Sequence, residues 1–146
     1  MTEERDRTER QMAELLQEMR IALPGVQFLF AFLLTVPFAA RFQNVTSFQR
    51  TAYFVALMFT AGSAVFLIAV PATHRLLFQQ GDRPYIIRNA NRYLIVSLVL
   101  LAIGMLSALV SLTDFLYGGA ATWVWPGLIA ALLSVLWFVR PLLRRR

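Results

Sequence analysis

The sequence contains no cysteine and no lysine, and it has one histidine among its 146 residues. The absence of cysteine excludes disulfides, thiol redox chemistry and thiolate metal sites. Charged residues make up only 15% of the chain, whereas soluble domains carry about 25%. Hydrophobic residues make up 58%, above the roughly 45–50% of soluble domains. This balance predicts a multi-pass membrane protein.

Four long stretches contain no Asp, Glu, Lys, Arg or His, and they cover residues 21–40, 51–73, 93–113 and 115–139. A helix of 20 residues rises about 30 Å, which matches the hydrocarbon core of a bilayer. Gly118 and Gly119 suit a turn, so we expect the last helix to occupy about residues 120–139. The stretches are apolar on every face, which predicts helices rather than barrel strands. The expected fold is all-α, with four transmembrane helices.

Arginine placement predicts the orientation of these helices. Twelve of the 14 arginines lie in the N-terminal segment, in the linker between the second and third spans, or at the C-terminus, and only Arg41 and Arg50 lie elsewhere. The positive-inside rule therefore places both termini in the cytoplasm and the protein in the cell membrane. A net charge of +6 flanking apolar spans does not form the single basic face of a nucleic-acid binder. The exclusive use of arginine is typical of a GC-rich bacterial genome.

Residues 1–20 form a segment of a different kind. Apolar residues recur there at helical spacing, at Met12, Leu15, Leu16, Met19 and Leu23. Six acids and four arginines give the segment a net charge of −2, which suits anionic lipid poorly. We therefore expect a cytoplasmic amphipathic helix at 1–20 and a transmembrane domain at 21–146, with a bend at Pro24 and Gly25. The helix either packs against the second linker or a neighbouring subunit, or lies in the membrane interface without a special role.

Titratable side chains are too scarce and too scattered for most enzyme mechanisms. Asp114 is expected at the outer end of the third span and His74 at the inner end of the second, about one bilayer thickness apart. A Ser-His-Asp group cannot form across that distance. The sequence has no HExxH motif, no glycine-rich phosphate loop and no carboxylate pair within a span. We expect no enzymatic activity, no catalytic residue, no cofactor and no metal ion.

Gln27 and the pair His74 and Arg75, near the first two spans, are candidates for a functional role. Gln27 is the seventh residue of the first span, where its amide either clamps two helices together or lines a permeation path. His74 and Arg75 follow Pro71, which is expected to close the second span. This pair either anchors the helix end at the interface or senses pH through the histidine.

Asp114 is the third candidate, because it ends the third span. It either caps a helix or turn, or makes an external cation contact with Arg41 or Arg50 opposite. Arg41 and Arg50 are candidates because each is a cation that Asp114 could contact.

Small residues recur along three spans at spacings that favour close helix packing. In the second span they are Ala52, Ala56, Thr60 and Ala64; in the third, Ser97, Gly104, Ala108 and Ser111; in the fourth, Gly127, Ala131 and Ser134. We expect these to form complementary seams, either within one bundle or between subunits.

Several motifs lie between residues 14 and 92: ELLQEMRIA (14–22), GVQ (25–27), FAFLLT (30–35), PF (37–38), RF (41–42), FQR (48–50), Pro71, HRLLF (74–78) and NR (91–92). Together they resemble a family of uncharacterised four-helix integral membrane proteins from actinobacteria. The last two spans share only hydrophobic character with it. Some members carry a sodium:proton antiporter label, so the resemblance implies ion transport. The matching positions for a site are Gln27, Arg41, Arg50, His74 and Arg75.

The leading hypothesis is a non-enzymatic membrane component with a structural or regulatory role. Its partners are the lipid bilayer and either another copy of the chain or another membrane protein. The alternative is an oligomeric ion or proton transporter or channel whose pore is built jointly by several subunits. The uncharged spans favour the first hypothesis, because ion-coupled transport usually requires an ionisable residue inside the membrane.

Overall fold

A computed structural model of the chain describes residues 2–77 and 83–143, and within these ranges it contains helices and no strands. The α-helices are α1 (Thr2–Thr35), α2 (Ser47–Leu77), α3 (Arg83–Leu116), α4 (Ala121–Leu133) and α5 (Arg140–Leu143). Two 3₁₀ turns, η1 (Val36–Phe38) and η2 (Ala40–Asn44), connect α1 to α2. Four segments are long and apolar enough to cross a membrane, at Met19–Phe38, Ser47–Thr73, Asn89–Leu116 and Ala121–Val139. The predictions of an all-α fold and of four helices of membrane-spanning length are confirmed.

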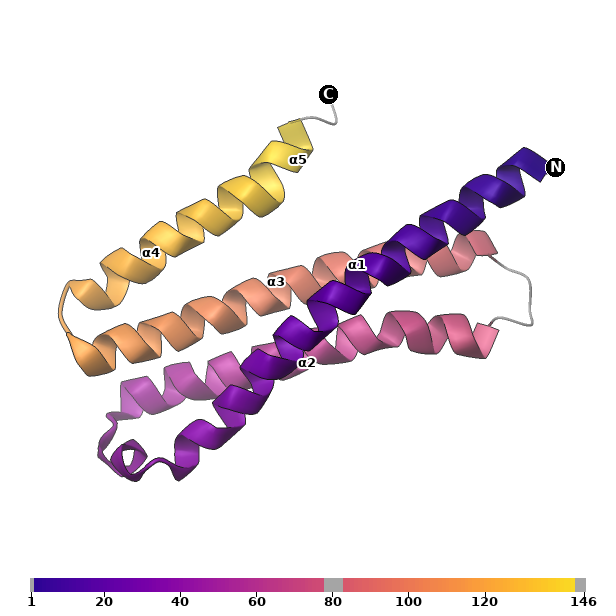
Figure 1. The fold of residues 1–146 in the computed structure, drawn as a ribbon. Coiled ribbons are helices and arrows are strands. Elements are labelled where there is room, and N and C mark those ends of the chain that lie inside the picture. The colour runs from indigo at the N-terminus through magenta and orange to yellow at the C-terminus, as the bar shows by residue number, and fades with distance from the viewer. Residues whose placement is uncertain (1, 78–82, 144–146) are drawn as a thin grey trace.

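The helices α2 and α3 form an antiparallel pair along most of their length, as Figure 1 shows. Helix α1 crosses this pair, and α4 packs beside α3. The start of α1 and the two helix ends that flank the second linker lie toward one end of the bundle, and α4 and α5 run toward that end but stop short of it. The η1–η2 connection and the turn between α3 and α4 lie at the other end. Within the described ranges, α1 and α4 do not approach each other closely.

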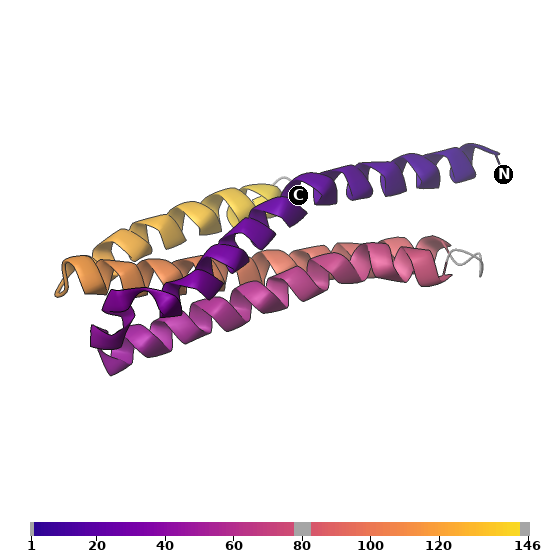
Figure 2. The same cartoon turned by 60° about the horizontal axis from the view of Figure 1, so that its bottom comes forward.

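Helix α1 is continuous through Pro24 and Gly25, so the amphipathic segment and the first span form one helix. Its direction changes along its length (Figure 2), as expected for a helix that contains a proline. Met19 of the predicted apolar stripe is buried against Val70 of α2 and Ala90 of α3. At Met19, the apolar stripe of α1 therefore packs between the C-terminal part of α2 and the N-terminal part of α3. The side chains of Met12, Leu15 and Leu16 lie outside the described part of the structure.

Helices α2 and α3 approach each other closely at Gly104. A Cβ atom added there would lie 2.6 Å from Thr60 Oγ1, 3.1 Å from Thr60 N and 3.2 Å from the carbonyl oxygen of Ala56. Ala56 and Thr60 are fully buried. The small residues of the second and third spans thus form a seam inside one chain, which confirms that part of the packing prediction.

The small residues of the fourth span do not form such a seam. Gly127, Ala131 and Ser134 are exposed, and no other atom lies within 4 Å of a Cβ added at Gly127. Instead, α4 buries Thr122 and Pro126, which are one turn apart on a different face of the helix. Of the two alternatives for the fourth seam, packing within the bundle is therefore not formed among the described residues, and packing between subunits stays a prediction.

Glycine and proline residues mark several ends of the helices. Gly118 and Gly119 adopt φ angles of +63° and +59°, a left-handed conformation that glycine allows, and α4 begins directly after this turn. Helix α3 begins at Arg83 with Pro84 in its first turn. The expected prolyl break at Pro71 is not formed, because α2 continues to Leu77, whereas the apolar span itself ends at Thr73 as predicted. The neighbouring Val70 is buried against α1 and α3, and such packing supports a helix across the hydrogen bond that proline removes.

The last span changes its helical geometry before it ends. Residues 134–139 form a π-helix, η3 (Ser134–Val139), between α4 and α5. Its wider turn is marked by the Arg140 amide, which donates to the carbonyl of Val135, five residues earlier. Pro141 follows in the sequence and has no amide hydrogen to continue the usual α-helical pattern.

Candidate functional site

The first turn of α2 carries a capping box that fixes the position of Gln49. The Thr46 amide donates to Gln49 Oε1 at 3.0 Å, and the Gln49 amide donates to Thr46 Oγ1 at 3.2 Å. Two backbone donors that have no partner within the helix are satisfied in this way. The pattern Thr-x-x-Gln therefore explains why α2 begins at Ser47. It also holds the Gln49 side chain in one orientation, where it is 7% exposed.

Gln49 and Thr122 both bind the carboxylate of Asp114. Gln49 Nε2 donates to Asp114 Oδ2 at 2.9 Å, and Thr122 Oγ1 donates to Asp114 Oδ1 at 2.9 Å. The donors come from α2 and α4, so one acidic side chain of α3 connects three helices. Hydrogen bonds to a charged group contribute about 1.5–3 kcal/mol each when they are shielded from water.

A further hydrogen bond extends this group of polar residues. Ser111 lies one turn before Asp114 on α3, and its hydroxyl donates to the backbone carbonyl of Gln49 at 3.0 Å. We refer to Thr46, Gln49, Ser111, Asp114 and Thr122 as the Asp114 cluster. All five residues lie near the end of the bundle that holds the α1–α2 connection and the α3–α4 turn. The cluster fixes the relative positions of α2, α3 and α4 at that end.

The structure corrects the predicted roles of Asp114. Asp114 lies within the last turn of α3, and the N-cap of α4 is Ala120, without a side-chain hydrogen bond. The carboxylate accepts from the neutral side chains Gln49 and Thr122 rather than from Arg41 or Arg50, which are both exposed. Neither the cap nor the contact with an arginine is formed. Asp114 instead joins helices, because its position on α3 faces both neighbouring helices.

Sequence reasoning missed Gln49 and Thr122 as partners of Asp114, and it placed Ser111 only in the small-residue seam of the third span. The Thr-x-x-Gln spacing at 46–49 is a recognisable capping box and could have singled out Gln49. No local pattern marks Thr122, because its partner depends on which helix faces lie against each other.

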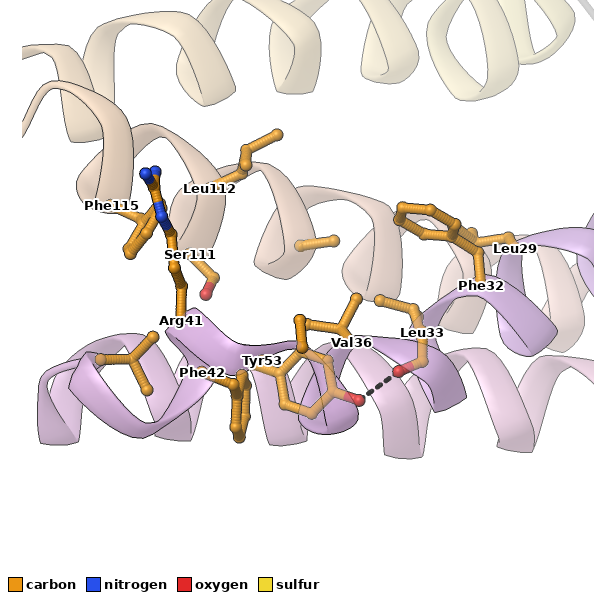
Figure 3. A pocket seen from close by; sticks show the side chains of 13 residues that line it. Leu29, Phe32, Leu33, Val36, Arg41, Phe42, Tyr53, Ser111, Leu112 and Phe115 are labelled. Atoms are coloured by element: carbon orange, nitrogen blue, oxygen red, sulfur yellow. Dashed lines mark hydrogen bonds between the residues drawn. The ribbon is translucent and has the colours of Figure 1, made fainter.

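An apolar pocket of about 290 Å³ adjoins the Asp114 cluster, and Figure 3 shows the side chains that line it. Its walls come from the end of α1, the α1–α2 connection, α2 and α3. Ten of the lining residues are apolar: Leu29, Phe32, Leu33, Val36, Ala39, Phe42, Val45, Ala108, Leu112 and Phe115. Arg41, Tyr53 and Ser111 are the polar ones. Ser111 is thus shared between the pocket and the Asp114 cluster.

Two of these three polar groups are bound to backbone carbonyls. The Tyr53 hydroxyl donates to the carbonyl of Leu33, and Ser111 donates to that of Gln49. Arg41, in contrast, is exposed and extends from the α1–α2 connection toward Phe115 of α3 (Figure 3). The pocket is therefore an apolar space with one cationic side chain at its edge.

The remaining predicted positions do not join this site. Gln27 lies on an exposed face of α1, so the predicted clamp between helices is not formed within the described chain. Arg50 is exposed on the first turn of α2 and does not line the pocket. Arg75 is exposed near the other end of α2. The side chain of His74 lies outside the described part of the structure, so its two predicted roles stay predictions.

Comparisons with known proteins identify the family. A family of unknown function, DUF6328, matches residues 2–141, and the chain belongs to this family. No curated protein and no solved structure matches the chain. The family description names no activity, so the antiporter label and the actinobacterial source stay predictions.

Proposed function

We propose that this protein is a non-enzymatic component of the cell membrane with a structural or regulatory role. One observation carries the proposal. Asp114 is the only acidic residue within the four spans of the described chain, and both of its carboxylate oxygens accept hydrogen bonds from neighbouring helices. An ion-coupled transporter requires an ionisable group that exchanges its ion or proton during transport. A carboxylate that joins three helices is better suited to holding the bundle together.

The contact between α2 and α3 supports the same proposal. Ser63 Oγ donates to the carbonyl of Ser97 at 2.9 Å, and Ser97 Oγ donates to the carbonyl of Leu94 at 2.8 Å. Both hydroxyls are fully or almost fully buried. Their hydrogen bonds to the backbone of the neighbouring turn or helix strengthen the packing of α2 against α3.

The arrangement of the helix ends is consistent with the proposed topology. The start of α1, the end of α2 and the start of α3, which adjoin arginine-rich segments, lie toward one end of the bundle, and α4 and α5 run toward that end. In this proposal that end faces the cytoplasm, as the positive-inside rule requires, and the Asp114 cluster faces the outside. The partner is another membrane protein or a second copy of the chain, and the size of the detergent-solubilised particle distinguishes the two.

A flux assay tests the functional proposal. The purified full-length chain is reconstituted in liposomes, and the movement of Na⁺, K⁺ and H⁺ is measured at two pH values beside protein-free liposomes. We expect the same rates in both preparations. Flux above the protein-free rate that is abolished by Gln27→Leu or His74→Ala would contradict the proposal. That result would favour the alternative of an oligomeric transporter or channel.

A further inference from the structure

The apolar pocket has the chemistry of a site for a hydrocarbon chain. Ten of its lining residues are apolar, and the hydroxyls of Tyr53 and Ser111 are already bound to backbone carbonyls. A polar ligand placed inside would lose its hydration and would find no free donor on these two hydroxyls. An apolar ligand meets no such cost.

The position and size of the pocket limit what can occupy it. Phe32, Leu112 and Phe115 line the pocket and are also exposed, so the pocket opens on the lateral surface of the bundle. Its volume is about 290 Å³. A transmembrane helix with side chains is about 10–12 Å across and does not fit in this space. Part of a single acyl chain is thinner than a helix and suits an apolar space of this size.

Arg41 supplies the second part of the argument. It lies three residues beyond the end of the first span at Phe38, at the depth where lipid headgroups begin. Its side chain lines the pocket and extends toward Phe115 (Figure 3). Arginine binds phosphate through up to two parallel N–H donors. An anionic phospholipid presents that phosphate without the ammonium group of a zwitterionic headgroup, which would repel the guanidinium.

We propose that this pocket binds an anionic phospholipid, with one acyl chain in the apolar space and the phosphate on Arg41. The lipid comes from the surrounding bilayer and packs against α1 and α3 beside the Asp114 cluster. This proposal rests on the membrane placement that underlies the proposed function, and it does not depend on whether the protein conducts ions. A flux result therefore tests the function alone, and a lipid-binding result tests the pocket alone.

Photocrosslinking in liposomes tests the proposal. The full-length chain is reconstituted in phosphatidylcholine with a trace of phosphatidylglycerol that carries a diazirine on its acyl chain. After illumination, the labelled residues are mapped by mass spectrometry. We expect the label to concentrate on pocket residues. Arg41→Gln is expected to lower this labelling about fivefold, whereas Arg50→Gln, which removes the same charge outside the pocket, leaves it unchanged.

A second pair of variants tests the binding of the acyl chain separately from the binding of the headgroup. Leu112→Trp fills the pocket, whereas Leu116→Trp places the same side chain one turn later, outside the lining. Only the first is expected to abolish labelling of the pocket. Equal losses in the two arginine variants, or pocket labelling that survives Leu112→Trp, would overturn the proposal. Displacement of the probe by oleate as readily as by phosphatidylglycerol would overturn the assignment to a phospholipid.

Discussion

Thr60 of α2 lies so close to Gly104 of α3 that only a hydrogen atom fits in the position of a side chain at residue 104. A Cβ there would lie 2.6 Å from Thr60 Oγ1 and 3.1 Å from the backbone nitrogen of the same residue. Rotation of the Thr60 side chain could relieve the contact with its hydroxyl oxygen but not the contacts at 3.1 Å and 3.2 Å with the backbone of α2. We therefore expect α2 and α3 to shift apart by a few tenths of an ångström if residue 104 is enlarged.

The first prediction concerns this contact. Gly104→Ala is expected to lower the free energy of unfolding by about 1–2 kcal/mol, because overpacking exceeds the gain in helix propensity of about 1 kcal/mol. Unfolding in mixed detergent micelles measures the change. Gly127→Ala is the matched control, since no other atom lies within 4 Å of its added Cβ. The control is expected to leave stability unchanged or raised, and an equal loss in both variants would refute the close contact.

The second prediction concerns the hydroxyl of Thr60. It is fully buried and has no hydrogen-bond partner among the described residues. Thr60→Val keeps the shape and removes the oxygen, so the free energy of unfolding is expected to stay the same or to rise by about 1 kcal/mol. Ser63→Ala, which removes the hydrogen bond to Ser97, is expected to lower it by about 0.6 kcal/mol. A larger loss for Thr60→Val than for Ser63→Ala would show that the Thr60 hydroxyl has a partner.

The third prediction concerns the Asp114 cluster. Gln49→Leu removes the donor to Asp114 and the acceptor for the Thr46 amide, so we expect stability to fall by about 1–3 kcal/mol. Gln43→Leu is the control, because Gln43 is exposed in η2. Combining Gln49→Leu with Asp114→Leu is expected to cost less than the sum of the single variants, as coupled neighbours do. Strictly additive losses would mean that the two side chains do not interact.

The fourth prediction uses the absence of cysteine, which allows each position to be labelled alone. In the proposed topology, a cysteine introduced by Gln43→Cys lies outside the cell and one introduced by Gln17→Cys lies in the cytoplasm. Both positions are exposed in the structure. A membrane-impermeant maleimide is expected to label only the first in intact cells and both after lysis. Labelling of Gln17→Cys alone in intact cells would show that the chain has the opposite orientation to the proposed one.

The number, type and approximate bounds of the helices follow from the sequence. A bilayer leaves no partner for an unpaired backbone group, so long uncharged stretches must be helical. The expected last span at 120–139 and the observed segment Ala121–Val139 differ by only one residue at the start. The agreement is close because Gly118 and Gly119 form a turn directly before this span. The close packing of the second and third spans also followed from their small residues.

Only the tertiary structure decided which helix faces meet. It placed Gln27 on an exposed face, left the small residues of α4 unpacked and brought Gln49 within 2.9 Å of Asp114, 65 residues later in the chain. In a soluble protein, hydrophobic periodicity shows which face of a helix is buried. In a membrane the surrounding lipid is as apolar as the core, so the pattern that specifies a span carries little information about its neighbours.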